Sequence, residues 1–190
     1  MPFPLSPKQF IYPHGNSTSL EVLCDFEVDG GGWTVIQKRS SGPADDFNRN
    51  WTEYANGFGS LGGNFWLGLE NIHTLTKNGD QELRIEMEDF EGGKRYAKYS
   101  NFSISNASDF YTLTIGGYSG DAGDSMANYT YPHILNHGMR FTTKDKDNDK
   151  FYWWNIVKHF ESFGGWWVSQ KSTVDIFLFT ISNKKKEEKI

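Results

Sequence analysis

The stretch QELRIEMEDFEGGKRYAKYSNFSI, residues 81–104, contains two segments, 81–90 and 94–104, in which apolar and polar side chains alternate. Such alternation is typical of strands with one buried face, and the two glycines between the segments allow a tight turn. The segment FYTLTIGGYSG, residues 110–120, adds a third strand of similar character. We therefore predict an antiparallel sheet at the centre of the chain.

The residues before this sheet predict a hairpin and two short helices. Residues 19–28 and 32–39 alternate like strands, and the sequence Asp-Gly-Gly-Gly at their junction supplies a tight connection. Aromatic side chains recur at helical spacing within residues 49–59, and apolar side chains do so within residues 64–79. Because glycines end both segments, we predict one short helix in each.

The remaining residues lack a regular pattern or change character. Between residues 121 and 167 glycine, aspartate and tryptophan dominate and no periodicity is visible. A long irregular stretch in a compact domain is often functional. The last segment, residues 172–190, joins a β-prone apolar run to a charged end. We expect it to be an edge strand with a tail, or a segment outside the domain.

The composition indicates one domain with neither a nucleic-acid surface nor a membrane span. A chain of 190 residues can bury one sizeable core, and 20 glycines with 16% aromatic residues suit short strands and tight turns. The formal net charge of −5 lacks the basic excess that nucleic-acid binding requires. No apolar stretch reaches the length of a membrane span.

The evidence on cellular compartment points in two directions. No signal peptide is visible at the start of the chain, and Cys24 is its only cysteine, so no disulfide can form within it. Five Asn-x-Ser/Thr sequons, in contrast, favour passage through the secretory pathway. The candidate glycosylation residues are Asn16, Asn50, Asn101, Asn106 and Asn128.

The sequence TKDKDNDKFYWW, residues 143–154, places three aspartates on alternate positions. Lys150 and Ile156 stand where an EF-hand loop starting at Asp145 needs its glycine and glutamate, so that type of calcium loop is excluded. Three carboxylates in a short loop still suit a hard cation, with backbone carbonyls completing the shell. The alternative is a solvated loop whose charge is screened by neighbouring lysines.

Catalytic signatures are not found in the sequence. GYSGD, residues 117–121, approaches the nucleophile elbow of hydrolases but has Asp121 where the closing glycine belongs. The five histidines show no HExxH spacing, and no glycine loop opens a helix in a way that would hold phosphate. We therefore predict that the chain is not an enzyme.

Five blocks of the sequence together resemble the fibrinogen C-terminal, or fibrinogen-related, domain. The resemblance assigns residues 10–171 to this domain and leaves residues 172–190 as a divergent tail. It implies an α+β fold with an N-terminal hairpin subdomain, a central antiparallel sheet with short helices, and an incomplete, loop-rich C-terminal subdomain. The blocks are CDFEVDGGGWTVIQKR (24–39), DFNRNWTEYANGFGSLGGNFWLGLENIHTLT (46–76), LRIEMEDFEGGKRYAKYSNF (83–102), YTLTIGGYSGDAGDSM (111–126) and GMRFTTKDKDNDKF (138–151).

The resemblance also implies a calcium site. The side-chain ligands of the family fall on Asp147 and Asp149, and its backbone carbonyl ligands fall on Phe151 and Trp153. Asp145 then becomes a neighbour of the ion rather than a ligand. Trp153 departs from the family, which commonly has glycine there, and the backbone at this point favours conformations that a bulky residue resists.

Further departures concern the cysteines and the end of the chain. The two C-terminal cysteines of the family align with Asn155 and Lys171, so their disulfide is lost. Cys24 resembles the second cysteine of the N-terminal pair, whose partner would lie at or before the start of this chain. In lectin-like relatives the residues after the position of Lys171 build most of the ligand pocket. We therefore expect a product truncated at both ends.

The resemblance implies a secreted recognition domain that uses calcium. We expect lectin-like binding of acetylated glycans in innate defence, as in ficolins and tachylectins. One alternative is an extracellular module that binds protein, as in angiopoietin-like and tenascin relatives, and another is a truncated product with impaired binding. The expected partner is a glycan or an extracellular protein, and oligomerisation would use a stalk outside this chain.

Overall fold

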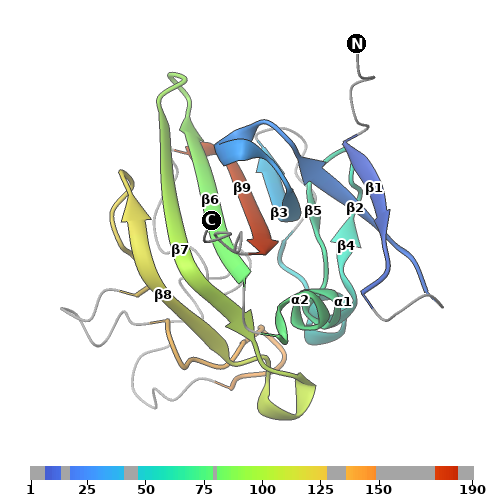
Figure 1. Cartoon of the computed structure of the whole chain (residues 1–190). Coiled ribbons are helices and arrows are strands. Elements are labelled where there is room, and N and C mark those ends of the chain that lie inside the picture. The colour runs from blue at the N-terminus through green and yellow to red at the C-terminus, as the bar shows by residue number, and fades with distance from the viewer. Residues whose placement is uncertain are drawn as a thin grey trace, which may run out of the picture.

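The computed structural model describes residues 7–13, 18–40, 47–78, 81–127, 136–148 and 174–183 (Figure 1). Within these residues nine strands form one sheet, and the main path runs β1, β2, β3, β9, β6, β7, β8. All strand pairs are antiparallel. The strands of the main path are β1 Lys8–Ile11, β2 Leu20–Asp25, β3 Trp33–Ser40, β6 Gln81–Asp89, β7 Lys94–Ile104, β8 Leu113–Gly120 and β9 Val174–Asn183.

The β6–β7 hairpin lies where the sequence predicts it. Glu86 of β6 stands opposite Tyr96 of β7. The Asp89 carboxylate holds the turn because it accepts hydrogen bonds from the backbone N–H groups of Glu91 (3.0 Å) and Gly93 (2.7 Å). β8 pairs along the other side of β7, so the predicted three-stranded antiparallel unit is confirmed.

The predicted N-terminal hairpin is also present. β2 and β3 pair with Leu23 opposite Val35, and a 3₁₀ helix, η1 (Val28–Gly30), occupies their connection. Oδ1 of Asp25 accepts hydrogen bonds from the backbone N–H groups of Glu27 (2.9 Å) and Val28 (3.0 Å). Such local side-chain acceptors stabilise turns at which the backbone leaves the ladder.

Two helices follow, and both are shorter than the segments that predicted them. Helix α1 spans Trp51–Asn56 and helix α2 spans Leu69–Thr76. Between them lie the short strands β4 (Phe58–Gly59) and β5 (Phe65–Trp66), which pair with each other, and β5 also pairs with β3. Gly57 at the end of α1 has φ of 92°, a conformation that stops a helix, so the chain leaves α1 there and enters β4.

Strand β9 occupies the centre of the sheet, between β3 and β6 (Figure 1). Ile181 stands opposite Thr34 of β3 on one side and Leu83 of β6 on the other. The expectation that residues 172–190 form an edge strand with a tail, or lie outside the domain, is therefore wrong for β9. Phe179, Thr180 and Ile181 are all buried, as expected for a strand that is covered on both faces. The continuous apolar run of this segment is therefore the pattern of a central strand rather than of an edge strand.

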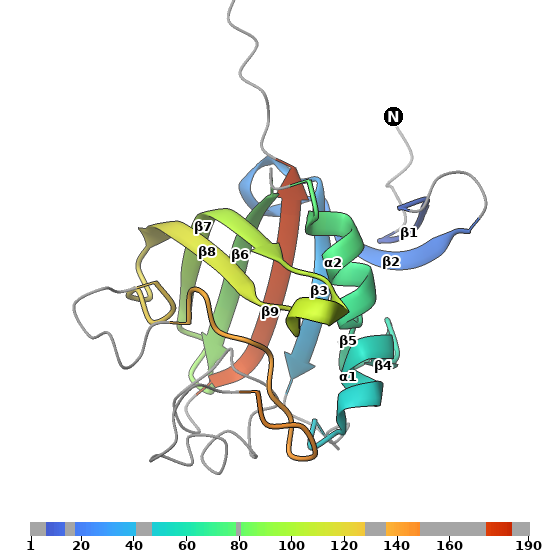
Figure 2. The ribbon, with the colours of Figure 1, turned by 90° about the horizontal axis from the view of Figure 1, so that it is seen from below.

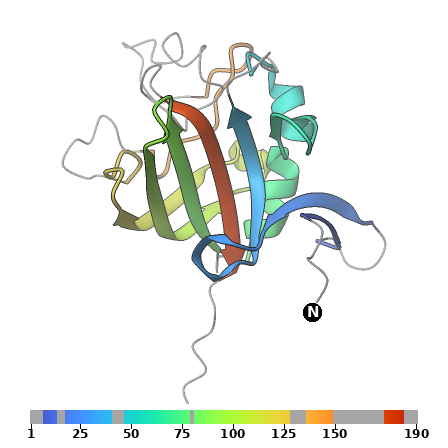
Figure 3. The ribbon, with the colours of Figure 1, turned by 90° about the horizontal axis from the view of Figure 1, so that it is seen from above.

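The helices and the sheet enclose one apolar core. Figures 2 and 3 show α1 and α2 together beside β4 and β5, with α2 close to the sheet. Leu69 and Ile72 of α2 and Leu83 and Phe102 of the sheet are fully buried in this core. Leu75, on the predicted apolar face of α2, packs against the core and is partly buried. No helix in the described ranges has the length and apolar character of a membrane span.

The irregular residues 136–139 extend the sheet beyond β8. The backbone N–H of Leu113 donates to the carbonyl of Met139 (2.9 Å), and the N–H of Gly138 donates to the carbonyl of Leu113 (2.7 Å). The N–H of Ile115 donates to Nδ1 of His137 (3.1 Å). These bonds fix the start of the loop that carries the predicted calcium ligands.

Candidate metal and recognition site

The loop of residues 141–148 begins at a buried aromatic anchor. Phe141 is fully buried, and its ring centroid lies 5.2 Å from that of Tyr54 and 6.4 Å from that of Trp66. At the other end of the loop, Nδ2 of Asn148 donates to the carbonyl of Phe141 (2.8 Å). Both ends of the loop are therefore tied to the same point of the core.

A tight turn within this loop is attached to the start of α1. Thr143 and Lys146 exchange two backbone hydrogen bonds, which leaves Asp145 in the turn between them. Oδ1 of Asp145 accepts hydrogen bonds from Oγ1 of Thr143 and from the backbone N–H of Trp51, both at 2.9 Å. The first N–H groups of a helix have no partner inside the helix, so Asp145 supplies one from a distant segment.

These contacts change the acidity of Asp145. Partial desolvation, the largest single influence, raises the pKa of its carboxyl group. The hydrogen bonds from Thr143 and Trp51 and the charge of Lys144 together outweigh it, and the pKa lies below its ordinary value. Asp145 is therefore an ionised group that holds the loop against the helix.

The lysines of the turn also contact the domain. Nζ of Lys144 donates to the carbonyl of Asn48 (2.8 Å). Nζ of Lys146 lies 4.0 Å from the ring centroid of Trp51 and 5.2 Å from that of Phe110. A cation over an aromatic ring stabilises an exposed site by about 0.5–1 kcal/mol. These two lysines therefore attach the loop, beyond any screening of its acidic side chains.

The turn beside this loop has an unusual backbone. Phe110 and Tyr111 both have positive φ, 53° and 51°, which is uncommon for bulky residues. The N–H of Phe141 donates to the carbonyl of Phe110 (2.9 Å), and the Tyr111 hydroxyl donates a short hydrogen bond to the Glu70 carboxylate. Desolvation first, and then the contact with Glu70, raise the pKa of Tyr111. This turn thus connects the loop to helix α2.

Of the four predicted calcium ligands, one lies in the described part of the chain. Asp147 is exposed, two residues beyond the turn that contacts α1. Asp149, Phe151 and Trp153 lie outside the described residues. Within the described ranges, no group of three or more His, Cys, Asp or Glu side chains is placed to hold a metal ion. The predicted donors are two carboxylates and two backbone carbonyls, and this all-oxygen set fits calcium in kind.

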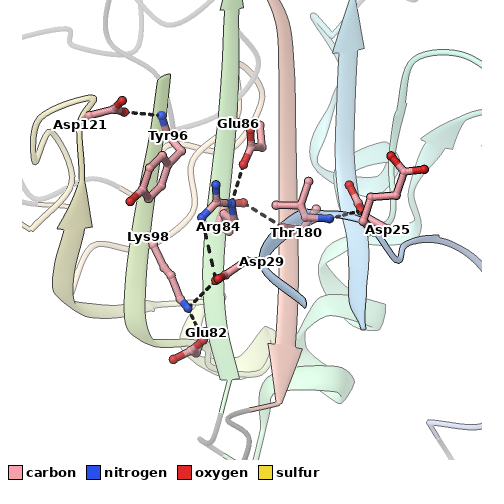
Figure 4. A network of polar contacts seen from close by, with 11 residues as sticks. Asp25, Asp29, Glu82, Arg84, Glu86, Tyr96, Lys98, Asp121 and Thr180 are labelled. Carbon is pink, nitrogen blue, oxygen red and sulfur yellow. Dashed lines mark hydrogen bonds and ion pairs between the residues drawn. The ribbon is translucent and has the colours of Figure 1, made fainter. Parts of the chain in front are cut away.

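A second polar cluster lies on the outer face of β6 and β7 (Figure 4). Asp29, in the β2–β3 connection, accepts a hydrogen bond from Nζ of Lys98 (2.8 Å) and lies 4.0 Å from a guanidinium nitrogen of Arg84. Nζ of Lys98 also lies 3.0 Å from the Glu82 carboxylate. The hydrogen bond with Asp29 is the main cause of a raised pKa of Lys98, against an opposing effect of desolvation.

This cluster fastens the N-terminal hairpin to the central sheet. Each of its charged groups has a partner of opposite sign, and the Arg84 guanidinium also stacks 4.0 Å from the ring centroid of Tyr96. Sequence analysis missed this contact because Asp29 and Lys98 are 69 positions apart. The alternation of apolar and polar side chains along β6 was the only signal, and it indicated no more than one buried and one exposed face.

The predicted glycosylation residues have different environments. Oδ1 of Asn50 accepts the backbone N–H of the third residue of α1 (2.9 Å). Oδ1 of Asn106 accepts from the backbone N–H (3.1 Å) and hydroxyl (2.7 Å) of Ser108 and from the N–H of Asp109 (3.3 Å). Asn101 is exposed on β7. The residues outside the described ranges are Asn16 and Asn128.

Comparison with protein families and curated relatives gives consistent matches. The family model for the C-terminal globular domain of fibrinogen beta and gamma chains matches residues 5–187. Fibrinogen-like protein 1 of Bos taurus is 44% identical over 167 residues, which cover 84% of this chain and 52% of that protein. Angiopoietin-related protein 1 of Homo sapiens is 44% identical over 159 residues, which cover 84% of this chain and 30% of that protein. The chain thus spans about half the length of fibrinogen-like protein 1, and less of the second relative.

Solved structures show the same architecture. The fibrinogen-like globe domain of human ANGPTL2 superimposes with a TM-score of 0.80 at 32% identity, covering 95% of this chain and 94% of that one. Lamprey fibrin D-dimer, complexed with the peptide ligand Gly-His-Arg-Pro-amide, gives a TM-score of 0.76 at 28% identity. The second match covers 94% of this chain and 70% of the lamprey chain.

Proposed function

This chain belongs to the family of the C-terminal globular domain of fibrinogen beta and gamma chains, and we propose that it acts outside the cell by binding another protein. Members of this family are non-enzymatic binding domains, which confirms the prediction that the chain is not an enzyme. The observation that carries the proposal is its likeness, over 94% of its length, to a lamprey domain solved with a peptide ligand. The five sequons support the extracellular location.

Binding to intact cells tests this proposal. The folded chain, fluorescently labelled, is added to cultured cells, and the bound fraction is measured by flow cytometry with the heat-unfolded chain as control. We expect saturable binding that disappears after the cells are treated with protease and persists in excess N-acetylglucosamine. Saturable binding that resists protease and is displaced by the sugar would favour the lectin-like alternative instead. The absence of saturable binding would contradict both.

We further propose that the chain holds one calcium ion with the carboxylates of Asp147 and Asp149 and the backbone carbonyls of Phe151 and Trp153. When bound, the ion would supply a fixed positive charge that draws these oxygens together. The all-oxygen donor set supports this proposal, because calcium prefers such ligands. So does the attachment of the preceding turn to α1 through Asp145, which reduces the conformational freedom that binding would have to remove.

Calcium binding is measured directly by calorimetric titration of the intact chain. Stabilisation is measured as the difference in thermal unfolding between solutions with calcium and with EGTA. At calcium concentrations about 100 times Kd, binding to the folded state alone should add about 2.7 kcal/mol. Asp147→Asn should abolish the calorimetric signal and the stabilisation, whereas Asp109→Asn, a change at an exposed carboxylate of another turn, should retain both. Equal behaviour of the two variants would rule out the proposed ligand set.

A further inference from the structure

Asn101 differs from the other described sequon residues because its side chain has no hydrogen-bond partner among the residues that the structure describes. It is exposed on β7, and its neighbour Phe102 is fully buried, so Asn101 faces away from the core. Ser103, the hydroxyl residue of the sequon, lies two positions further along the strand and therefore on the same face. Within the described residues, the side chain of Asn101 makes no hydrogen bond.

The side chains of Asn50 and Asn106, in contrast, already accept hydrogen bonds. Each uses Oδ1 to accept backbone N–H groups at the start of a helical turn. An N-linked sugar leaves this oxygen in place, so the caps do not forbid a glycan. They do fix the rotamer, and the attached sugar must then follow the direction that the helix end imposes. Asn101 can instead turn to accommodate its sugar.

The surface beside Asn101 has room for a sugar ring. Gly116 of β8 stands directly opposite Asn101, and Gly117 follows it. A Cβ atom added at Gly116 would meet no other atom within 4 Å. Among the described residues, the space beside the backbone of Gly116 is therefore unfilled, whereas the Ser100 side chain lies against Gly117.

That edge is open. β8 is the last strand of the sheet, and residues 136–139 cover its outer backbone groups at Leu113 and Ile115. Past Ile115, no described segment bonds to the outer side of β8 as far as Ser119. The sequence IGGYSG, residues 115–120, carries no charge. An uncharged, uncovered strand edge can pair with the edge of another molecule, and natural proteins protect such edges.

We propose that Asn101 carries an N-linked glycan that covers the open edge of β8 and prevents edge-to-edge pairing between copies of this domain. The glycan is attached one strand away from the edge, opposite Gly116, where the strand carries no side chain. This inference rests on the proposed extracellular location, because N-glycans are added in the secretory pathway.

Site occupancy is the first test. The full chain, fused to a secretion signal, is expressed in animal cells, and its peptides are analysed by mass spectrometry after enzymatic release of N-glycans, which converts each modified Asn to Asp. We expect Asn101 to be occupied and Asn101→Gln and Ser103→Ala each to lose the mass of one glycan. An unmodified Asn101 in the secreted protein overturns the proposal. Because the fusion enters the secretory pathway by design, this result is independent of where the native protein resides.

Association is the second test. Light scattering should show Asn101→Gln forming larger species at concentrations where the unsubstituted chain and the Asn106→Gln control stay monomeric. Enzymatic removal of glycans from the folded, unsubstituted chain should have the same effect, which guards against a folding defect of the variant. A charge placed on the open edge, Ser119→Lys, should restore the monomer in the Asn101→Gln background. If removing the glycan leaves the chain monomeric, the protective role is wrong.

Discussion

Glu53 and Asn50 bind each other reciprocally at the start of α1. Oδ1 of Asn50 accepts the N–H of Glu53, and Oε2 of Glu53 accepts the N–H of Asn50 (3.0 Å). This capping box satisfies two groups that a helix start leaves without partners. The hydrogen bond from the backbone N–H of Asn50 is the main reason that the pKa of Glu53 lies below 4.5, and Arg49 lowers this pKa further.

The first prediction concerns the pH dependence of this helix start. Because the folded-state pKa of Glu53 is lowered, its stabilising contribution should be fully present above pH 4.5 and be lost as pH falls through the folded-state pKa. A titration of the Glu53 carboxyl carbon by NMR should show a midpoint below 4.5. Arg49→Gln should raise that midpoint without bringing it to 4.5, since the hydrogen bond from the backbone N–H of Asn50 to the Glu53 carboxylate remains. A midpoint in the unsubstituted chain at or above 4.5 would contradict the assignment.

The second prediction concerns Gly57, where α1 ends. A Cβ atom there would lie 2.8 Å from the carbonyl oxygen of Leu67, and φ is 92°. Gly57→Ala should lower the free energy of unfolding by about 2–4 kcal/mol, the sum of backbone strain and overpacking. Gly92→Ala is the control, because it has φ of 83° but open space around the new methyl group, and should cost about 1–2 kcal/mol. Denaturant unfolding measures both, and equal losses would show that the close approach to Leu67 does not matter.

At the residue scale, sequence reasoning identified the acidic loop but not how it is held. The hydrogen bond between Asp145 and Trp51 joins positions 94 apart, and no local pattern indicates it. The oxygen chemistry of the predicted ligands is visible in the sequence. The attachment of their loop depends on tertiary packing around Phe141, which the sequence alone did not predict.

The third prediction belongs to the scale of elements and tests the place of β9. Phe179 is 1% exposed in the centre of the sheet, so Phe179→Ala should lower the free energy of unfolding by about 3–5 kcal/mol. The control Phe90→Ala removes the same atoms from a side chain that is 66% exposed at the β6–β7 turn. This substitution should change the free energy of unfolding by less than about 0.5 kcal/mol. If thermal or denaturant unfolding gave similar losses for the two variants, β9 would not be a core strand in solution.

Elements that depend on neighbouring residues were predicted well, and those that depend on distant ones were not. The β6–β7 and β2–β3 hairpins follow from alternation and from turn residues that lie between their strands. The apolar run of β9 indicates a strand but does not name its partners, so its central position was missed. Helix α1 ends earlier than its segment because Gly57, with φ of 92°, leads directly into β4, a boundary that helical spacing alone does not reveal.

The fourth prediction concerns the whole molecule. One sheet continues from β1 to β8 through β9, and the Asp29–Lys98 contact fastens the N-terminal hairpin across it. The domain should therefore unfold as one cooperative unit. Tryptophan fluorescence and far-ultraviolet circular dichroism, followed on the same samples in denaturant, should give coincident transitions. Separate midpoints would show that the hairpin region and the central sheet unfold independently, and would support the impaired, truncated product considered from the sequence.

At this scale, the family and the α+β fold were predictable because ordered blocks of sequence extend along most of the chain. Ligand choice was not predictable. A resemblance shared by sugar-binding and protein-binding relatives leaves both chemistries open, and the residues that would distinguish them are spread over loops without periodicity.

The central position of β9 has a consequence for synthesis. On the ribosome, β3 and β6 emerge long before the strand that separates them, so the nascent chain must keep two inner edges apart without a partner. A hydrogen-bonded pairing of β3 directly with β6 would close the sheet too early and exclude β9. Folding of the sheet therefore cannot be completed until Val174–Asn183 has been made.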